Sequence, residues 1–139
     1  MKYTISEVEL DLDTLQTLAE LDKTCFPADA QVVFGGTRWW VVECVGEPVA
    51  YGGLEHLPED RGFLCRVGVL RAHRRKGLHR RLIRARERGA RALGMKRLVT
   101  YTDKDNVSSS NNLIKCGYQL YRPEGEWGAL NGLYWWRDL

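Results

Sequence analysis

The alternation of hydrophobic and polar residues predicts a strand and then helical structure in the first quarter of the chain. Residues 2–10 alternate loosely, as a half-buried strand does, and leucines recur at helical spacing over residues 12–21. Pro27 ends or kinks the segment that follows. We expect a second, short helix over residues 28–34.

The next residues have the composition of two paired strands. The runs 38–45 and 48–55 are rich in β-branched and aromatic residues, and the turn Gly46-Glu47 joins them. Two such runs separated by a tight turn are typical of a β-hairpin.

A further strand and the clearest helix of the chain come after this hairpin. Residues 62–70 predict a strand, in which Gly68 indicates a bulge or a close backbone approach by a ligand. Residues 78–93 carry apolar side chains on one helical face, and Gly94 is placed to end the helix.

The last third of the chain predicts one more strand, one helix and a strand pair. Residues 97–102 form the strand, a serine among 108–110 caps a helix that runs to Lys115, and residues 118–122 and 130–137 form the pair. The resulting order of elements indicates an α/β fold with a mixed sheet. We expect a single domain that spans residues 1–139.

Composition narrows the class of protein. The chain of 139 residues is 44% hydrophobic, which is enough for a core, but no apolar run approaches the roughly 20 residues of a membrane span. The first residues do not resemble a secretory signal. Cys25, Cys44, Cys65 and Cys116 are widely spaced, so we expect reduced thiols, no metal site and a cytoplasmic protein.

The charge is distributed unevenly. Residues 71–97 hold twelve Lys or Arg and a single acid, Glu87, whereas the whole chain has a net charge of only +3. A compact basic segment on an otherwise acidic chain indicates one anionic partner at one place. Nucleic acid, a membrane surface and a phosphorylated cofactor all satisfy this charge pattern.

The basic segment begins where a predicted strand runs into a helix. The free N–H groups and the dipole of a helix N-terminus favour an anion. Gly77 lets the backbone approach such a group closely, and Arg74, Arg75 and Lys76 add positive charge. The spacing matches neither a P-loop nor a dinucleotide-binding GxGxxG loop, although the physical features predict a pyrophosphate site.

These residues resemble motif A of the GNAT superfamily, the Gcn5-related N-acetyltransferases. The core of that motif is [Arg/Gln]-x-x-Gly-x-[Gly/Ala], and the chain reads Arg74-Arg75-Lys76-Gly77-Leu78-His79. His79 stands where the family usually has a small residue, and it either crowds the pyrophosphate or points away.

A second segment is similar to a later motif of the same superfamily, Asn-x-x-Ala-x-x-x-Tyr-x-Lys-x-Gly-Phe. Asn106, Lys115, Gly117 and the aromatic Tyr118 match at the same spacing, and Ser109 replaces the alanine. Leu113 stands at the position of the family's tyrosine, which often protonates the departing thiolate. The role of that tyrosine therefore cannot be assigned to this position of the chain.

The resemblance implies a fold and a cofactor. The GNAT fold is a mixed central β-sheet with a bulge or splay between the fourth and fifth strands, flanked by about four helices. The resemblance implies that acetyl-CoA binds at the following residues: Val67, Gly68, Val69, Arg74, Arg75, Lys76, Gly77, Leu78, His79, Arg80, Asn106 and Ser109.

The resemblance also implies a mechanism, in which a primary amine attacks acetyl-CoA directly in a ternary complex. Backbone N–H groups near Val67 would stabilise the developing oxyanion. Glu55 is the first candidate for the general base and Glu43 the second, and solvent is an alternative. Tyr101 and Tyr118 are candidate acids. The acceptor would be a small-molecule or peptide amine.

Two aromatic and acidic features bear on that acceptor. Trp127 lies in a glycine-rich loop that could cover its pocket, and tryptophans on the predicted strands could instead form a homodimer interface. A ring of acids would favour a cationic amine, and the candidates are Glu55, Glu59, Asp60, Glu124 and Glu126.

Two other functions remain open from the sequence. The absent tyrosine and the absent acid on the strand 62–70 are compatible with a protein that binds acyl-CoA without turnover. An arginine-rich helix face could instead make the chain a nucleic-acid-binding module, with Arg80, Arg81, Arg84, Arg88 and Arg91 as its contacts. The N-acetyltransferase is the function we expect, with no membrane as its partner and with nucleic acid as a less favoured one.

Overall fold

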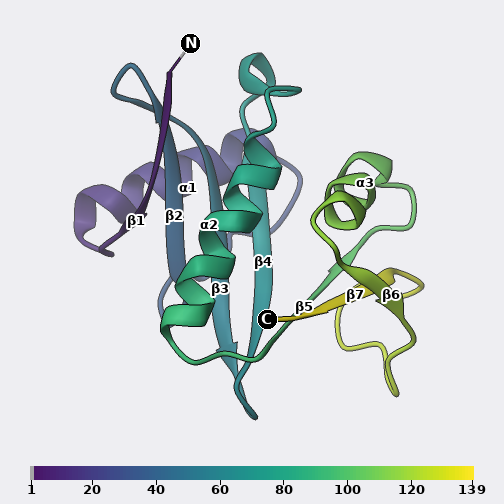
Figure 1. Ribbon diagram of the computed structural model, residues 1–139. Coiled ribbons are helices and arrows are strands. Elements are labelled where there is room, and N and C mark those ends of the chain that lie inside the picture. The colour runs from purple at the N-terminus through teal and green to yellow at the C-terminus, as the bar shows by residue number, and fades with distance from the viewer. Residues whose placement is uncertain (1) are drawn as a thin grey trace.

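The computed structural model describes residues 2–139 and has a seven-stranded sheet with helices on both faces (Figure 1). The elements in chain order are β1 (Tyr3–Val8), α1 (Leu12–Cys25), β2 (Arg38–Cys44), β3 (Glu47–Leu57), β4 (Arg61–Val69), the 3₁₀ turn η1 (Arg71–His73), α2 (Leu78–Ala92), β5 (Arg97–Thr102), α3 (Val107–Lys115), β6 (Gln119–Tyr121) and β7 (Leu133–Asp138).

The sheet opens between its fourth and fifth strands. The strand order is β1-β2-β3-β4-β5-β7-β6, and every neighbouring pair is antiparallel except β4 and β5. These two strands run parallel and pair only through residues 61–63 and 97–99. They then diverge, as Figure 1 shows. The mixed sheet and the splay predicted from the resemblance are therefore confirmed.

Each face of the sheet has its own hydrophobic core. On one face α1 packs on Trp39, Val41 and Tyr51, and on the other face α2 packs on Trp40 and Val42. Alternate residues of β2 thus serve opposite cores, which explains why this strand is apolar on both sides. In Figure 1, α1 lies behind the sheet, and α2 and α3 lie in front of it.

The helix expected over residues 28–34 is a wrong prediction, because this segment forms a turn and then irregular backbone. The segment is too short to be a stable helix by itself. Tertiary contacts hold it in another shape: the Phe34 ring lies 5.0 Å from that of Trp39, and the Trp39 indole donates a 2.9 Å hydrogen bond to the Phe34 carbonyl. Residues 2–139 thus contain three α-helices and one 3₁₀ turn.

Two predicted boundaries move by a few residues. The hairpin is present, but its turn residues are Val45 and Gly46, which both have positive φ, as a type I′ turn requires. The helix α3 begins after Asn106, whose side chain accepts a hydrogen bond from the Ser109 amide. Asn106 therefore caps the helix in place of the serines.

The bulge of β4 lies at Arg66 and not at Gly68. Residues 52 and 53 of β3 pair with residues 67 and 65 of β4, so Arg66 is the extra residue. Its φ of 33° is a conformation that a side chain other than glycine rarely adopts. The bulge bends β4 where it separates from β5, because a bulged strand bends and twists more strongly.

Gly68 is explained by a neighbouring side chain. A Cβ atom at this position would lie 2.5 Å from a ring carbon of Tyr51 and 3.0 Å from the sulfur of Cys25. The close approach predicted for Gly68 therefore involves the core under α1, in addition to any ligand.

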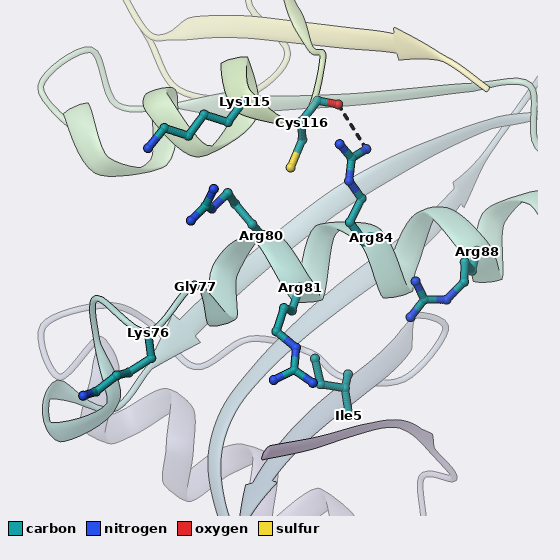
Figure 2. Close-up of a pocket in the computed structure, with 9 residues that line it drawn as sticks. All are labelled: Ile5, Lys76, Gly77, Arg80, Arg81, Arg84, Arg88, Lys115 and Cys116. Atoms are coloured by element: carbon teal, nitrogen blue, oxygen red, sulfur yellow. Dashed lines mark hydrogen bonds between the residues drawn. The ribbon is translucent and has the colours of Figure 1, made fainter. Parts of the chain in front are cut away.

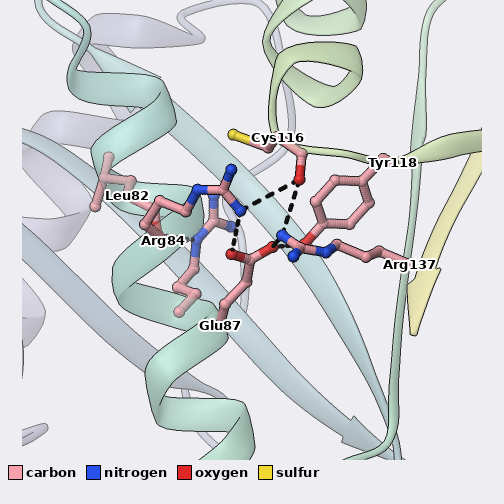
Figure 3. Close-up of polar contacts among 7 residues, drawn as sticks. Leu82, Arg84, Glu87, Cys116, Tyr118 and Arg137 are labelled. Carbon is pink, nitrogen blue, oxygen red and sulfur yellow. Dashed lines mark hydrogen bonds and ion pairs between the residues drawn. The ribbon is translucent and has the colours of Figure 1, made fainter. Parts of the chain in front are cut away.

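A buried acid ties α2 to the far half of the sheet (Figure 3). The carboxylate of Glu87 accepts hydrogen bonds from Arg84 at 2.9 Å, Arg137 at 2.9 Å and the Tyr118 hydroxyl at 2.8 Å. Both arginines also donate to the carbonyl oxygen of Cys116, which ends α3. One network thus joins α2, the end of α3 and β7 across the splay.

Candidate active site

The loop between β4 and α2 leaves the N-terminus of α2 open. Gly77 is the residue before the helix, has a φ of 77° and gives no side-chain cap. Arg75 also has a positive φ, of 62°. The first N–H groups of α2 therefore lack a capping side chain and are free to bind an anion, as the sequence predicts.

A groove of about 640 Å³ starts at this helix end and follows β4 toward α3. It brings together eleven of the twelve residues expected at the cofactor, namely Val67, Gly68, Val69, Arg74, Arg75, Gly77, Leu78, His79, Arg80, Asn106 and Ser109. Lys76 does not line this groove and lies instead on a neighbouring one, drawn in Figure 2.

One edge of this groove is a strand without a partner. Beyond Phe63, β4 has no strand on the side of β5, because the two strands diverge there. The Leu64 carbonyl there accepts a hydrogen bond from the Thr100 hydroxyl, and the Val69 carbonyl accepts one from Arg74. No strand covers the backbone between them on that side, so an extended ligand can pair with it.

The groove also contains side chains that sequence reasoning missed. Cys25 and Phe26 come from the end of α1, and Asn112 and Lys115 come from α3. Burial raises the pKa of the Cys25 thiol, so this group stays protonated at neutral pH. Of these four residues, only Lys115 matches a position of the second motif, and that match is the feature of the sequence that could have identified it.

His79 points toward α3. Its Nδ1 atom lies 3.1 Å from the side-chain amide nitrogen of Asn112. Burial, with a smaller contribution from nearby Arg86, lowers the pKa of His79 to about 3, so the ring is neutral at physiological pH. The amide donates to Nδ1, which leaves the proton of the neutral ring on Nε2. His79 thus bridges two helices without adding a charge.

A second cavity, of about 420 Å³, lies where β4 and β5 separate, and His79 lines both cavities. Its other lining residues include the rings of Phe26, Phe63 and Tyr101, the acids Asp29 and Asp103, the arginines Arg66 and Arg86, and Leu113. The two cavities meet along β4, so a ligand in each would have its reactive end near the bulge.

Arg66 fixes the wall of this second cavity. It donates from Nε to Asp22 at 2.7 Å and from Nη1 to Asp29 at 3.0 Å, and its guanidinium lies 4.0 Å from the Phe26 ring centroid. Burial alone would raise the pKa of Asp22, but hydrogen bonds from Arg66 and Tyr51 outweigh it and lower that pKa. The strained bulge residue is therefore held by a buried carboxylate.

Arg86 satisfies the backbone that the bulge leaves unpaired. It is almost fully buried, and its Nη1 donates to the carbonyl oxygens of Gly53 at 3.0 Å and Cys65 at 3.4 Å. A Cβ at position 52 would lie 3.1 Å from the Arg86 guanidinium carbon, so Gly52 makes room for it. The sequence analysis did not single out Arg86. Its position one turn after Leu82 places it on the apolar face of α2, and that position is the sequence feature that indicates its burial.

The structure does not bring the expected bases to the cavity. Glu55 is exposed on β3, opposite Phe63, and lines neither the groove nor the cavity. Glu43 lies beside β1, with Ser6 and Val8. Of the candidate acids, Tyr101 lines the cavity, whereas the hydroxyl of Tyr118 is held by Glu87. The general base stays a prediction.

An aromatic cluster continues from the cavity over the open face of the sheet. Trp127, 44% exposed, packs edge-on against Tyr101 and Phe63, each at 5.3 Å between ring centroids. Its indole donates to the Tyr121 hydroxyl at 3.1 Å. The ring of acids expected at the pocket does not line the cavity: Glu55, Glu59, Asp60, Glu124 and Glu126 all lie outside it.

The sequence of residues 10–118 matches the family model described as the acetyltransferase (GNAT) family. The chain belongs to the GNAT family of acetyltransferases. That match spans both motifs, the groove and the bulge, so the resemblance of the two motifs extends over most of the chain. No curated protein matches the sequence.

Solved structures of GNAT proteins have the same fold. The ribosomal-protein-S18-alanine N-acetyltransferase from Escherichia coli superposes with a TM-score of 0.80 at 13% identity, covering 99% of this chain and 94% of that one. The PaiA N-acetyltransferase from Thermoplasma acidophilum, in complex with coenzyme A, gives 0.80 at 11% identity over 100% of both chains. A putative acyl-CoA N-acyltransferase from Klebsiella pneumoniae gives 0.79 at 22% identity, over 99% and 97%.

Two further observations concern the part of the chain that the structure describes. Residues 2–139 contain no group of three His, Cys, Asp or Glu side chains placed to hold a metal ion. Within the same residues no helix has the length and apolar character needed to cross a membrane.

Proposed function

We propose that this GNAT protein is an N-acetyltransferase that transfers an acetyl group from acetyl-CoA to a primary amine by direct attack in a ternary complex. The observation that carries the proposal is one continuous groove, which runs from the uncapped N-terminus of α2 at Gly77 to the free edge of β4.

The residues present fit acetyl-CoA. When bound, this cofactor supplies a thioester whose acetyl group an amine can accept. The N–H groups at the start of α2, together with Arg74, Arg75 and Arg80, bind the pyrophosphate. The free edge of β4 at Val67 to Val69 orients the pantetheine arm as an added strand.

The acceptor amine enters from the cavity between β4 and β5. The bulge at Arg66 leaves backbone groups near Val67 outside the ladder with β3, where an N–H can stabilise negative charge on an acyl oxygen. Glu55 and Glu43 line neither the groove nor the cavity, so solvent water is the proposed acceptor of the amine proton. The acceptor is a small-molecule or peptide amine.

One observation favours a second candidate, a protein that binds acyl-CoA with little turnover. Leu113 is buried, lines the cavity and occupies the position of the family's tyrosine, so no hydroxyl group is present there to protonate a departing thiolate. Robust binding without turnover across a broad panel of amines would support this candidate.

Calorimetric titration with acetyl-CoA tests the cofactor. We expect saturable 1:1 binding at micromolar concentrations and its loss in Gly77→Glu, because a carboxylate there repels the pyrophosphate. Gly94→Glu is the matched control, since Gly94 also has a left-handed φ, of 79°, but follows the other end of α2. Normal binding in Gly77→Glu, or none in the unmodified protein, would contradict the proposal.

The proposal also includes an expected location and an expected oligomeric state. A cytoplasmic site of action suits the four free cysteines, which a reducing compartment keeps as thiols. A homodimer stays a prediction, and sedimentation velocity measures it directly.

A further inference from the structure

A second groove, of about 530 Å³, follows the exposed side of α2 between β1 and the end of α3 (Figure 2). Its lining residues are Ile5, Lys76, Gly77, Arg80, Arg81, Arg84, Arg88, Lys115 and Cys116. Six of the nine are cationic and none is acidic. We call this surface the arginine groove.

The arginine groove holds charges that the protein itself leaves unneutralised. Among residues 2–139, Arg80 and Arg88 have no hydrogen-bonding or ion-pair partner, and Arg81 makes only a 3.4 Å contact to the Tyr3 carbonyl. Arg84 alone is paired, with Glu87. Like charges four residues apart repel on a helix, so an anion in the groove would stabilise this surface.

The spacing of the arginines suits a linear polyanion. Arg80, Arg84 and Arg88 are four residues apart on α2, which places their Cα atoms about 6 Å apart along the helix axis. Figure 2 shows Lys76 and Arg80 at one end of this row and Arg88 at the other. Guanidinium groups bind phosphate oxygens in bidentate fashion, so a row of them can follow a phosphate backbone.

The groove of about 640 Å³ that starts at Gly77, called the cofactor groove from here on, does not include all of this surface. The arginine groove shares Gly77, Arg80 and Lys115 with the cofactor groove, whereas Arg81, Arg84 and Arg88 lie outside the latter. Arg84 is already paired with Glu87, so Arg81 and Arg88 are the arginines outside the cofactor groove that remain for a further anionic ligand.

The chemistry of the groove selects among polyanions. Ile5 and Cys116 are its only apolar side chains, so it lacks the apolar core and aromatic anchors of a protein interface. It also lacks the aromatic rings on which single-stranded nucleic acids stack. We propose that the arginine groove binds the phosphate backbone of a nucleic acid duplex without reading its sequence, as an activity additional to acetyl transfer.

Fluorescence anisotropy with a labelled 20-base-pair DNA duplex, over a series of salt concentrations and without acetyl-CoA, tests this inference. We expect binding that weakens steeply with salt. The variant Arg81→Gln/Arg88→Gln should reduce the slope of log K against log salt by about 2, since each neutralised phosphate contributes about 0.9. Acetyl-CoA titration of the same variant should be unchanged, which separates this result from the fate of the proposed enzyme.

The control variant is Lys23→Gln/Arg122→Gln, which removes the same charge from exposed positions on α1 and after β6. It should keep the slope of the unmodified protein to within about 0.5. Equal slopes in both variants, or absence of duplex binding at low salt, would overturn the proposal. Tighter binding of poly-glutamate of equal charge would overturn it too, in favour of an acidic protein partner.

Discussion

Several side chains that look like surface charges in the sequence are buried in the fold. Asp22, Arg86 and Glu87 are each 3% exposed or less. Each has partners that compensate its burial: Asp22 has Arg66, Glu87 has two arginines, and Arg86 has the bulge carbonyls. Removing the arginine that pairs with a buried carboxylate, as Arg66 does with Asp22, leaves a buried charge uncompensated, which costs about 3–5 kcal/mol.

The single residue His79 makes the stability of the folded protein depend on pH. Its folded pKa of about 3 lies below the ordinary value of 6.5, so between these values the unfolded chain binds a proton that the folded protein does not. Stability from this group is therefore complete above pH 6.5. It falls as the pH drops toward 3, by up to about 1.4 kcal/mol per pH unit.

Urea unfolding of the unmodified protein and of His79→Gln, at pH 7.5, 5.5 and 4.5, measures this effect. Other titrating groups contribute equally to both proteins, so the unmodified protein should lose stability relative to the variant as the pH falls. A stability difference independent of pH would show that the folded His79 titrates normally.

At the scale of elements, three parts of the helix α2 face three different surroundings. Its N-terminus faces the cofactor groove, its apolar side packs on the sheet, and its exposed side forms the arginine groove. Apolar periodicity predicts the helix and the packed side. It does not show that Gly89 lies against Trp40, because that contact depends on where β2 passes beneath the helix.

The substitution Gly89→Ala tests this packing. In most helix interiors this change stabilises by about 0.5–1 kcal/mol, but here the new Cβ would lie 2.5 Å from the Trp40 ring. We expect a net destabilisation of about 1–3 kcal/mol in urea unfolding, the usual cost of overpacking. Gly35→Ala is the control, since nothing lies within 4 Å of its Cβ, and it should be neutral. A stabilised Gly89→Ala would mean that Trp40 moves aside freely.

On the scale of the whole molecule, the splay divides the sheet into two halves. The backbone connects them through the pairing of residues 61–63 with 97–99 and through the hydrogen bond from Lys96 to the Asp60 carbonyl, and side chains such as Glu87 and Arg137 complete the connection. A ligand in the cofactor groove would touch both halves, since β4 lies on one side and α3 on the other.

Amide hydrogen exchange with acetyl-CoA at about 100 times its Kd tests this arrangement. Binding at that concentration stabilises the folded state by about 2.7 kcal/mol, so amides beneath the ligand should exchange up to about a hundredfold more slowly. We expect the slowing in peptides from residues 64–69 and 106–112 together. The hairpin turn at residues 45–46 should not change. Slowing on one side only would contradict a ligand that spans the splay.

The sequence by itself determined most elements and most of the residues that line the groove at the start of α2. The hairpin, α2 and the loop before Gly77 follow from local periodicity and turn chemistry, which depend on neighbours within a few residues. Both motifs likewise identify their residues by spacing alone. Eleven of the twelve expected cofactor residues consequently lie in one groove.

Only the tertiary structure decided which distant residues meet. The bulge lies at Arg66 because Asp22, on α1, and Arg86, on α2, together stabilise that strained backbone. Glu55 lies outside the cavity because β3 turns it to solvent, and Lys115 completes the arginine groove because α3 packs beside α2. Such contacts are non-local, and local patterns in a sequence carry no record of them.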